Sequence, residues 1–518
     1  MKNSLGLALS AAFILVAHPS SAQEWPAGFS ETQINRKVSE FNWAGPDQST
    51  ALDLFLSFQN ALAEGKMGMV ASVSSAKSQM DPNEADRPVS QKYKDDLYAE
   101  LILKQVTYRD SVAAIVTKNT SDWILFTYTW TENGKWVNGG QGMAFSESEV
   151  DSLLIQYLPV QARNRERIKR ITAVPADKKP FVDFLQQQTD SPEQFLLKQL
   201  KTHKLVINGE YHRRKVSWDM LRRLVAEASF PDVCGTVFLE LPSWHQPEMD
   251  AFLACPELRP ELILDIFRDE QIYGWYDKGE FDFICDIWRI NQSLPAGKRI
   301  SLQLADFQLP YSKILDPDAW QAALAQEEPR NPHMADVIER YIKRSTDTRS
   351  CLFEVGCGHV YKNVRTRLPG TPTAGALLRQ RLGEEAIFTV FQHTFSWDNF
   401  GRNKAPLRGG VFDDAFASLG NRPVGFVLQD SPFGKEPFDG LYELKYLADG
   451  GLYEDNYDGY LFLHSLQDEP QSEPLYAVFD DDFIREMMRR AKVFGMEDET
   501  WHGCKASEMT KEEVLKNL

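Results

Sequence analysis

Cysteine is scarce in this chain, and its spacing shows no metal-binding signature. The 518 residues include only six cysteines. No two of them form a Cys-x-x-Cys pair or a zinc-finger spacing, which argues against the common zinc modules. The first four lie in apolar contexts, so we expect buried thiols, with a Cys234–Cys255 disulfide left open as an alternative. The six are Cys234, Cys255, Cys285, Cys351, Cys357 and Cys504.

The chain also lacks a long apolar run and an excess of positive charge. Its early apolar run, residues 4–17, is shorter than the roughly 20 residues that span a bilayer. Lys2 precedes this run and the small residues 20–22 follow it, which predicts a signal peptide over residues 1–22, cleaved before Gln23. The net charge of −17 argues against nucleic acid or an anionic membrane as a partner. We therefore expect a periplasmic or secreted protein that binds neither.

The roughly 500 residues after this segment exceed what one hydrophobic core usually holds, so we expect more than one domain. Residues 48–170 have the pattern of a small α+β domain. An amphipathic helix is expected first and a closing helix last, with a hairpin turn at Asn133-Gly134 between the last two strands. The expected elements are helix 49–63, strands 101–108, 111–117, 123–130 and 135–145, and helix 147–162.

This order of a helix and a curved antiparallel sheet resembles the cone of nuclear transport factor-like folds. The resemblance implies an accessory module, and we expect that a homo-oligomer would form through it. The charged, proline-containing residues 171–198 are expected to form a linker, with a helix over 192–200 at its end.

Residues 199–518 alternate between strand-like and helix-like patterns. Such alternation predicts an α/β domain with a mostly parallel sheet and helices on both faces. We expect strands at 203–208, 236–241, 300–305, 351–356, 386–392, 424–429 and 460–463, and helices at 246–254, 281–293, 316–326, 334–343 and 374–382.

Two short motifs follow strands of this domain. Gly209-Glu210-Tyr211-His212 comes after the first strand, and Gly356-Cys357-Gly358-His359 follows the strand at 351–356. Polar groups just past the carboxyl ends of parallel strands face the ligand crevice. The two motifs therefore predict that two imidazoles and a carboxylate meet at one edge of the sheet.

Five segments between about residues 200 and 465 resemble erythromycin esterase-like and ChaN-like proteins, with the Tiki/TraB group as more distant relatives. They are VINGEYH, VFLELP, IWRINQSLPAGKRISLQLADFQ, FEVGCGHV and YDGYLFL. Glu240, in the second segment, stands where the family has an acidic residue. Macrolide esterases usually have one more residue between Glu and His in the first motif. Macrolide opening is therefore not implied for this chain.

The leading hypothesis is an esterase-like hydrolase of a small or medium-sized substrate. A histidine would act as general base on water, and carboxylates would orient it and stabilise the imidazolium. We expect no cofactor. The predicted catalytic residues are Glu210, His212, Glu240, Asp306 and His359. The predicted substrate-binding residues are Arg213 and Arg214, which could hold an anionic group, and Gly209, Gly356 and Gly358, which allow close approach.

Other hypotheses stay open. Glu210, His212 and His359 could instead hold a divalent metal for a hydrolase or peptidase. The ChaN resemblance implies a haem or iron-ligand protein, with Tyr211 or Tyr361 on the iron. A Cys357–His359 nucleophile pair and an interaction protein without catalysis are further alternatives. We expect His245, His393 and His464 to be structural, and pocket-lining side chains to come from residues 256–278 and 395–422.

Overall fold

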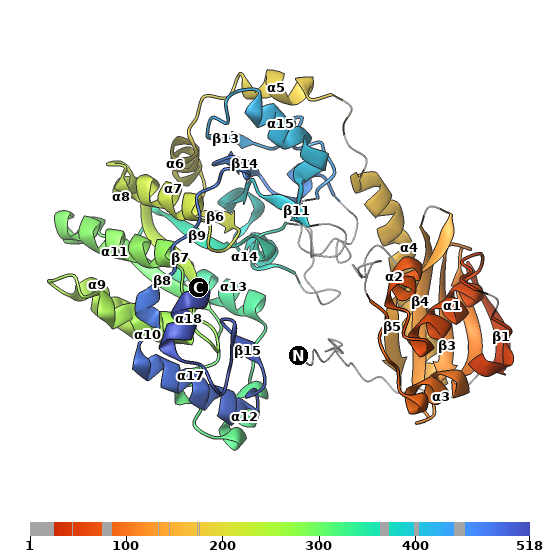
Figure 1. Ribbon diagram of the computed structural model, residues 1–518. Helices are drawn as coiled ribbons and strands as arrows, with labels where there is room; N and C mark the ends of the chain where they lie inside the picture. The colour runs from red at the N-terminus through yellow and green to blue at the C-terminus, as the bar shows by residue number, and fades with distance from the viewer. Residues whose placement is uncertain are drawn as a thin grey trace. The chain divides into compact units, whose positions relative to one another are not determined.

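The structure is a computed structural model, and the residues that it describes are 25–43, 45–74, 85–132, 134–144, 146–172, 175, 177–362, 372–397, 404–439 and 451–518. The predicted signal peptide and Asn133 lie outside these residues. The chain divides into two compact units, Met1–Glu166 and Arg167–Leu518 (Figure 1). Within the described ranges, no helix is both long enough and apolar enough to cross a membrane.

The first unit contains a five-stranded antiparallel sheet in the order β1-β2-β3-β4-β5. Its first strand was not expected, because the polar sequence of β1 has no apolar alternation. Gly134 has a φ of 77° between the paired residues Glu132 and Lys135, as the predicted hairpin requires. The elements are β1 (Phe29–Lys37), α1 (Ala51–Ala63), α2 (Met67–Val73), α3 (Gln91–Ala99), β2 (Leu101–Tyr108), β3 (Val112–Lys118), β4 (Ile124–Glu132), β5 (Lys135–Ala144) and α4 (Glu147–Thr172).

The second unit is built on a seven-stranded sheet in the order β13-β14-β10-β6-β9-β7-β8. Every neighbouring pair is parallel except β13 with β14. The predicted α/β class with a mostly parallel sheet is therefore confirmed. The strands are β6 (Leu205–Glu210), β7 (Cys234–Pro242), β8 (Ser301–Asp306), β9 (Ser350–Gly356), β10 (Ile387–Gln392), β13 (Val424–Val427) and β14 (Gly459–Phe462).

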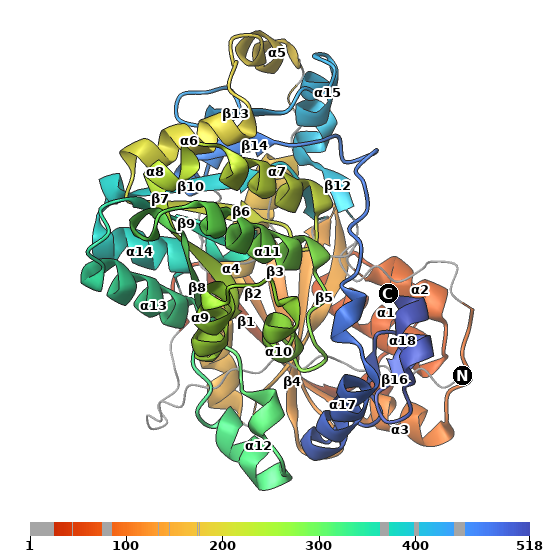
Figure 2. The same ribbon diagram turned by 90° about the vertical axis from the view of Figure 1, so that its left-hand side faces the viewer.

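Helices cover both faces of this sheet (Figure 2). Alternate strand residues point to opposite faces, so Val206 packs in one core while Leu205 and Ile207 pack in the other. The first face is covered by α6 (Pro192–Thr202), α7 (Lys215–Ala226), α9 (Gln246–Ala254), α10 (Leu264–Asp269), α11 (Lys278–Ser293) and α17 (Asp481–Phe494); the second by α5 (Lys179–Leu185), α13 (Arg330–Arg344), α14 (Ala374–Leu382) and α15 (Val411–Ala417).

The expected linker differs from what the structure contains. Residues 179–185 form α5, and Phe181 and Leu185 are buried in the core of the second unit. The pattern was missed because the helix is short and its apolar residues are few. The remaining elements are α8 (Phe230–Val233), α12 (Pro317–Leu324), β11 (Phe395–Trp397), β12 (Lys404–Pro406), α16 (Tyr453–Asn456), β15 (Thr500–Trp501), β16 (Cys504–Lys505) and α18 (Lys511–Asn517).

All six cysteines are free, so the structure does not contain a Cys234–Cys255 disulfide. Cys234 is fully buried at the start of β7, where its thiol donates to the carbonyl of Thr236. Cys255 follows α9 and is only partly buried. Burial raises the pKa of the Cys285 thiol to about 11, as expected for a packed, unreactive thiol.

Candidate functional site

The carboxyl ends of four neighbouring strands bring the predicted residues to one edge of the sheet. Glu210, the last residue of β6, pairs in register with Gly356, the last residue of β9. Glu240 lies near the end of β7, and Asp306 ends β8. The two motifs therefore meet because their strands are adjacent and parallel, and not because of any contact along the chain.

His212 and Glu210 form a hydrogen-bonded pair. His212 Nδ1 lies 2.8 Å from Glu210 Oε1. The carboxyl of Glu210 is buried, whereas the imidazole is 44% exposed. Desolvation lowers the pKa of His212, but the hydrogen bond to Glu210 and the charge of Glu240 outweigh it and raise that pKa to about 9. The carboxylate thus fixes the ring and stabilises its protonated form.

Glu240 is the central residue of the site, because its carboxylate faces Gly356, Arg330 and both imidazoles. Its Oε2 accepts the N–H of Gly356 at 2.6 Å, and its Oε1 accepts Arg330 Nη2 at 2.6 Å. The same Oε1 lies 3.2 Å from His359 Nε2, and Oε2 lies 3.9 Å from His212 Nε2. Burial raises the pKa of Glu240, but the charges of His359, Arg330 and His212 overcome it and hold that pKa well below its usual range. Glu240 is therefore a carboxylate between two imidazoles.

Arg330, the first residue of α13, was not predicted from sequence. It lies between Glu240 and Asp306, and donates to Asp306 through Nε at 2.9 Å and Nη2 at 2.5 Å. Desolvation lowers the pKa of Arg330, whereas the two carboxylates raise it, so the guanidinium stays charged. Asp306 is fully buried, and its carboxylate binds this guanidinium and the Gln308 amide. Asp306 therefore serves as an ion-pair partner of Arg330.

His359 is held from its other side by Asn331. His359 Nδ1 lies 2.7 Å from Asn331 Oδ1, and the same oxygen accepts the N–H of Ala374 at 3.1 Å. Because a backbone N–H donates to that atom, it is an acceptor, so the proton of this contact is on Nδ1 of His359. His359 therefore directs Nε2 toward Glu240.

The three predicted glycines differ in how closely they are approached. A Cβ on Gly356 would lie 2.6 Å from His212 Nε2 and 3.2 Å from Glu240 Oε2. A Cβ on Gly209 would lie 3.1 Å from a methyl of Val360 and 3.2 Å from the carbonyl of Val390. In the part of the chain that the structure describes, no atom lies within 4 Å of a Cβ placed on Gly358. Gly356 is the glycine that the site geometry requires.

A cavity opens beside these residues, with five glutamates in its lining against one arginine and one histidine. Three of the glutamates were not predicted, namely Glu270, Glu280 and Glu354. Burial is the main cause that raises the pKa of all three well above the usual range, and neighbouring carboxylates add to it. The lining is Glu210, His212, Trp218, Glu240, Glu270, Gln271, Trp275, Glu280, Arg330, Glu354 and Val355. Glu270, Gln271 and Trp275 come from the expected segment 256–278.

The two predicted arginines are engaged elsewhere. Arg214 is buried and donates to both carboxylate oxygens of Glu469, at 2.8 and 2.5 Å, and to the His393 carbonyl at 2.7 Å. Arg213 bonds the hydroxyl of Tyr276 and lies over its ring at 4.1 Å. Neither of them is in the described lining of the cavity, and Arg330 is the guanidinium that is.

Geometry gives little support to the haem and thiol alternatives. Tyr361 is buried among aromatic side chains, with ring centroids 5.7 Å from Tyr457 and 5.8 Å from Phe438. Tyr211 packs edge-on against Phe395 at 4.9 Å. Burial raises the pKa of the Cys357 thiol to about 12, which opposes formation of a nucleophilic thiolate. Among the described residues, no group of three or more His, Cys, Asp and Glu has the arrangement of a metal site.

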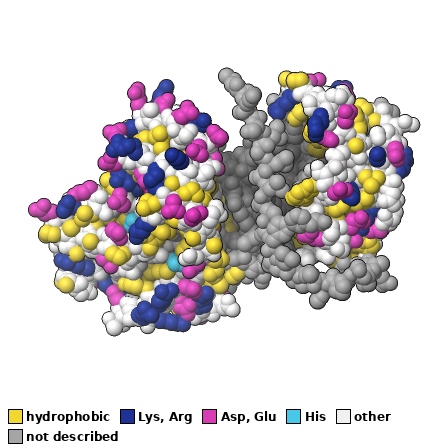
Figure 3. Space-filling model, turned by 90° about the horizontal axis from the view of Figure 1, so that it is seen from below, with side chains coloured by type: hydrophobic (Ala, Val, Ile, Leu, Met, Phe, Trp, Pro, Cys, Tyr) yellow, Lys and Arg dark blue, Asp and Glu magenta, His cyan; other side chains and the backbone are white. Residues whose placement is uncertain are grey.

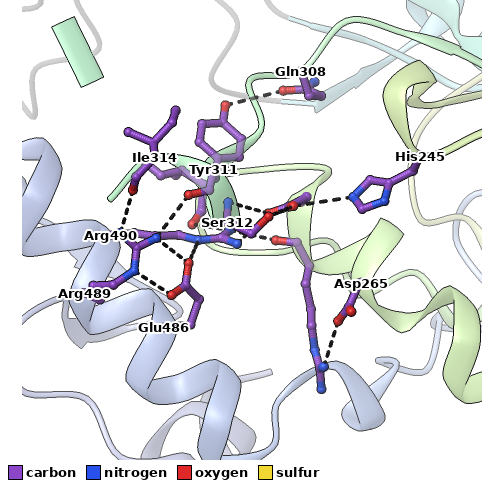
Figure 4. Close-up of polar contacts among 12 residues, drawn as sticks. His245, Asp265, Gln308, Tyr311, Ser312, Ile314, Glu486, Arg489 and Arg490 are labelled. Atoms are coloured by element: carbon purple, nitrogen blue, oxygen red, sulfur yellow. Dashed lines mark hydrogen bonds and ion pairs between the residues drawn. The ribbon is translucent and has the colours of Figure 1, made fainter. Parts of the chain in front are cut away.

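The three histidines that were expected to be structural lie away from the two motifs. His393 is fully buried, 2.6 Å from the Tyr460 hydroxyl, and His464 Nδ1 lies 2.9 Å from the Ser465 carbonyl. His245 is buried against Trp244, and its Nε2 lies 3.4 Å from Asp269. Figure 4 shows this region, in which Arg490 of α17 faces Ser312. Asp269, which directly precedes Glu270 of the cavity, forms a buried ion pair of 2.5 Å with Arg490.

Acidic and basic side chains are interspersed on the face of the molecule in Figure 3. Five glutamates, by contrast, are gathered in the lining of the cavity.

Neither a family model nor a curated protein matches the sequence of this chain. Among solved structures, a Bacillus cereus protein is similar, with 11% identity over 55% of this chain and 97% of its own length and a TM-score of 0.39. A mutant of erythromycin esterase EreC in its open conformation has 11% identity, coverage of 51% and 91%, and a TM-score of 0.35. Haem-bound ChaN of Campylobacter jejuni has 15% identity, coverage of 41% and 89%, and a TM-score of 0.28. These are distant likenesses, at 15% identity or less in each case.

Proposed function

We propose that the second unit is an esterase-like hydrolase in which His212 activates water without a metal. The pair of Glu210 and His212 carries this proposal. Glu210 holds Nδ1 at 2.8 Å, and among the described residues no hydrogen bond is made to Nε2. The ring is also 44% exposed at the cavity. An oriented imidazole whose second nitrogen makes no hydrogen bond is the arrangement of a general base.

Water is the proposed nucleophile because the nearest thiol is unsuited to attack. Cys357 is the only cysteine in the two motifs, and burial holds its pKa at about 12. When His212 takes a proton from water, Glu210 and Glu240 stabilise the imidazolium that forms. Arg330, which lines the same cavity, adds positive charge beside the place where a carbonyl oxygen would become negative.

The test is a screen of ester and lactone substrates with the purified protein, with and without a chelator. We expect turnover that survives the chelator and falls about 100- to 10,000-fold in His212→Ala. His203→Ala is the matched control, because His203 lies at the opposite end of β6 and should leave turnover unchanged. Turnover that the chelator abolishes, with about one metal per chain, would favour a metallohydrolase with Glu210, His212 and His359 as ligands.

The proposal places this hydrolase outside the cytoplasm, on a small or medium-sized substrate. The charged start, short apolar run and small residues before Gln23 support export. The acidic net charge of −17 supports a partner other than nucleic acid or an anionic membrane. Fractionation of cells that express the full chain, followed by N-terminal sequencing, tests both the location and the cleavage site.

A further inference from the structure

Among the described residues that line the cavity, three carboxyl oxygens have no hydrogen-bond partner. They are Glu210 Oε2, Glu270 Oε2 and Glu354 Oε1. All three side chains line the same cavity and are more than nine-tenths buried, at 4%, 5% and 2% exposure. A buried polar atom without a partner is destabilising, so three in one cavity point to a ligand that satisfies them.

These glutamates come from three separate elements. Glu210 ends β6, Glu354 lies within β9, and Glu270 follows α10. The second oxygen of Glu354 accepts the Asn208 amide at 2.7 Å, and the second oxygen of Glu210 binds His212. Each of these two residues is therefore fixed by one oxygen and presents the other. Rotation of either carboxyl group would only exchange its two oxygens and would leave one of them without a partner.

The charges around the cavity indicate what the ligand is. Arg330, its one guanidinium, is directed to Glu240 and Asp306. Glu280 accepts the indole N–H of Trp275, and Asp277, just behind, accepts that of Trp218. Those two indoles also line the cavity. The unsatisfied atoms are all potential acceptors, and the aromatic faces beside them favour a cation.

We infer that the cavity binds a protonated primary amine of the substrate, whose N–H groups satisfy Glu210, Glu270 and Glu354 while the reacting bond lies at His212. An ammonium group has three donors and one positive charge, which matches three acceptor oxygens of an acidic cavity. This inference rests on the proposed function, since it names the substrate class of the same site. It also predicts how binding depends on pH.

Proton release distinguishes an amine from a neutral polyol. Burial raises the pKa of Glu270 and Glu354 above the usual range, so in the empty cavity these carboxyls retain protons to higher pH. An ammonium group requires the carboxylate form, so its binding expels protons and tightens as pH rises from 5 to 8. A polyol can bind the protonated carboxyls and would release none.

The experiment is calorimetric titration of the full chain with propylamine, 1-propanol and glycerol, in two buffers of different ionisation enthalpy. We expect propylamine to bind with proton release, and the two alcohols to bind at least tenfold more weakly. Glu270→Gln and Glu354→Gln keep the shape but should each weaken propylamine roughly tenfold. Glu227→Gln, at the exposed end of α7, is the control and should bind as the unaltered protein does.

Two outcomes would overturn the inference. One is binding of glycerol or 1-propanol as tight as that of propylamine. The other is propylamine binding without proton release. This result is measured on the unaltered protein and does not depend on whether a variant folds. The proposed hydrolase is tested separately by ester turnover in His212→Ala. Ester turnover without amine binding would remove only the inference, whereas amine binding without turnover would remove only the hydrolase.

Discussion

His359 Nε2 lies 3.2 Å from Glu240 Oε1, while Nδ1 of the same ring lies 2.7 Å from Asn331 Oδ1. The contact with Glu240 is attractive only when a proton lies between the two atoms, because Nδ1 already uses its proton on Asn331. Asn331 therefore determines which ring nitrogen of His359 points toward Glu240. It is a positioning residue, since it acts on the site through His359.

Removal of this acceptor should weaken turnover without weakening substrate binding. In Asn331→Ala the ring loses its fixed orientation, and we expect kcat to fall roughly tenfold with KM unchanged, the effect of one lost hydrogen bond. Asn331→Asp keeps an acceptor for both His359 and the Ala374 N–H, and should recover most of the rate. Equal losses in both variants would contradict the positioning role.

The pH dependence of hydrolysis should follow His212. Its pKa is raised to about 9, so the ring is protonated at neutral pH and becomes a base only as pH rises. We expect kcat/KM to increase up to about pH 9. In Glu210→Gln, loss of the hydrogen-bonding carboxylate should move this rise to lower pH. NMR titration of the His212 ring checks the assignment, and a rise at the same pH in both proteins would contradict it.

The same raised pKa bears on stability. Because the folded-state pKa of His212 lies above its ordinary value of 6.5, the pair with Glu210 stabilises the fold fully below pH 6.5. That contribution is lost as pH rises through about 9. Half of the ring is exposed to solvent, so the contribution is small.

Much of the fold follows from the sequence because local patterns and the sheet rules agree. Every strand predicted in residues 199–518 is present, since buried parallel strands are apolar runs with clear ends. Strand β1 and helix α5 were missed for a physical reason. One is a polar edge strand stabilised by pairing with β2, and the other is a short helix stabilised by burial of Phe181.

The site was predictable only where strands end. Glu210 was found because parallel strands bring their carboxyl ends together, and Glu240 because its segment resembles the family. Arg330 and Glu270 lie at helix ends, where nothing local marks a site. Two signals in the sequence could still have pointed to the missed residues. Asp306 ends a buried strand, so its carboxylate requires a cation such as Arg330. Glu354 interrupts an apolar run, which marks it as a buried carboxyl group.

Arg330 should contribute strongly to the stability of the second unit. Asp306 is fully buried, so Arg330→Met would leave its charge without a cationic partner, and we expect a loss of about 3 kcal/mol in the free energy of unfolding. Addition of Asp306→Asn to this variant should recover more than half of the loss. Arg344→Met, at the exposed end of the same helix, should change stability by less than about 0.5 kcal/mol. Urea unfolding of the four proteins decides the matter.

Glu240 adds a test in acid. Its pKa lies well below the ordinary value of 4.5, so its pairing with His359 and Arg330 stabilises the fold above pH 4.5 and is lost as pH falls below that value. We therefore expect the unaltered protein to lose stability below pH 4.5 more steeply than Glu240→Gln. Parallel curves for the two proteins would contradict the ion-pair role.

Gly356 offers a steric test within a single motif. A Cβ there would lie 2.6 Å from His212 Nε2, which is closer than real Cβ contacts come, and 3.2 Å from Glu240 Oε2. Gly356→Ala must therefore displace the His212 imidazole from Glu240. We expect ester turnover to fall at least tenfold while the fold persists. Gly358→Ala, two residues later, meets open space and should keep full turnover. Equal effects of the two alanines on turnover, with matched thermal melting, would show that backbone freedom, and not the approach of His212, is what this motif requires.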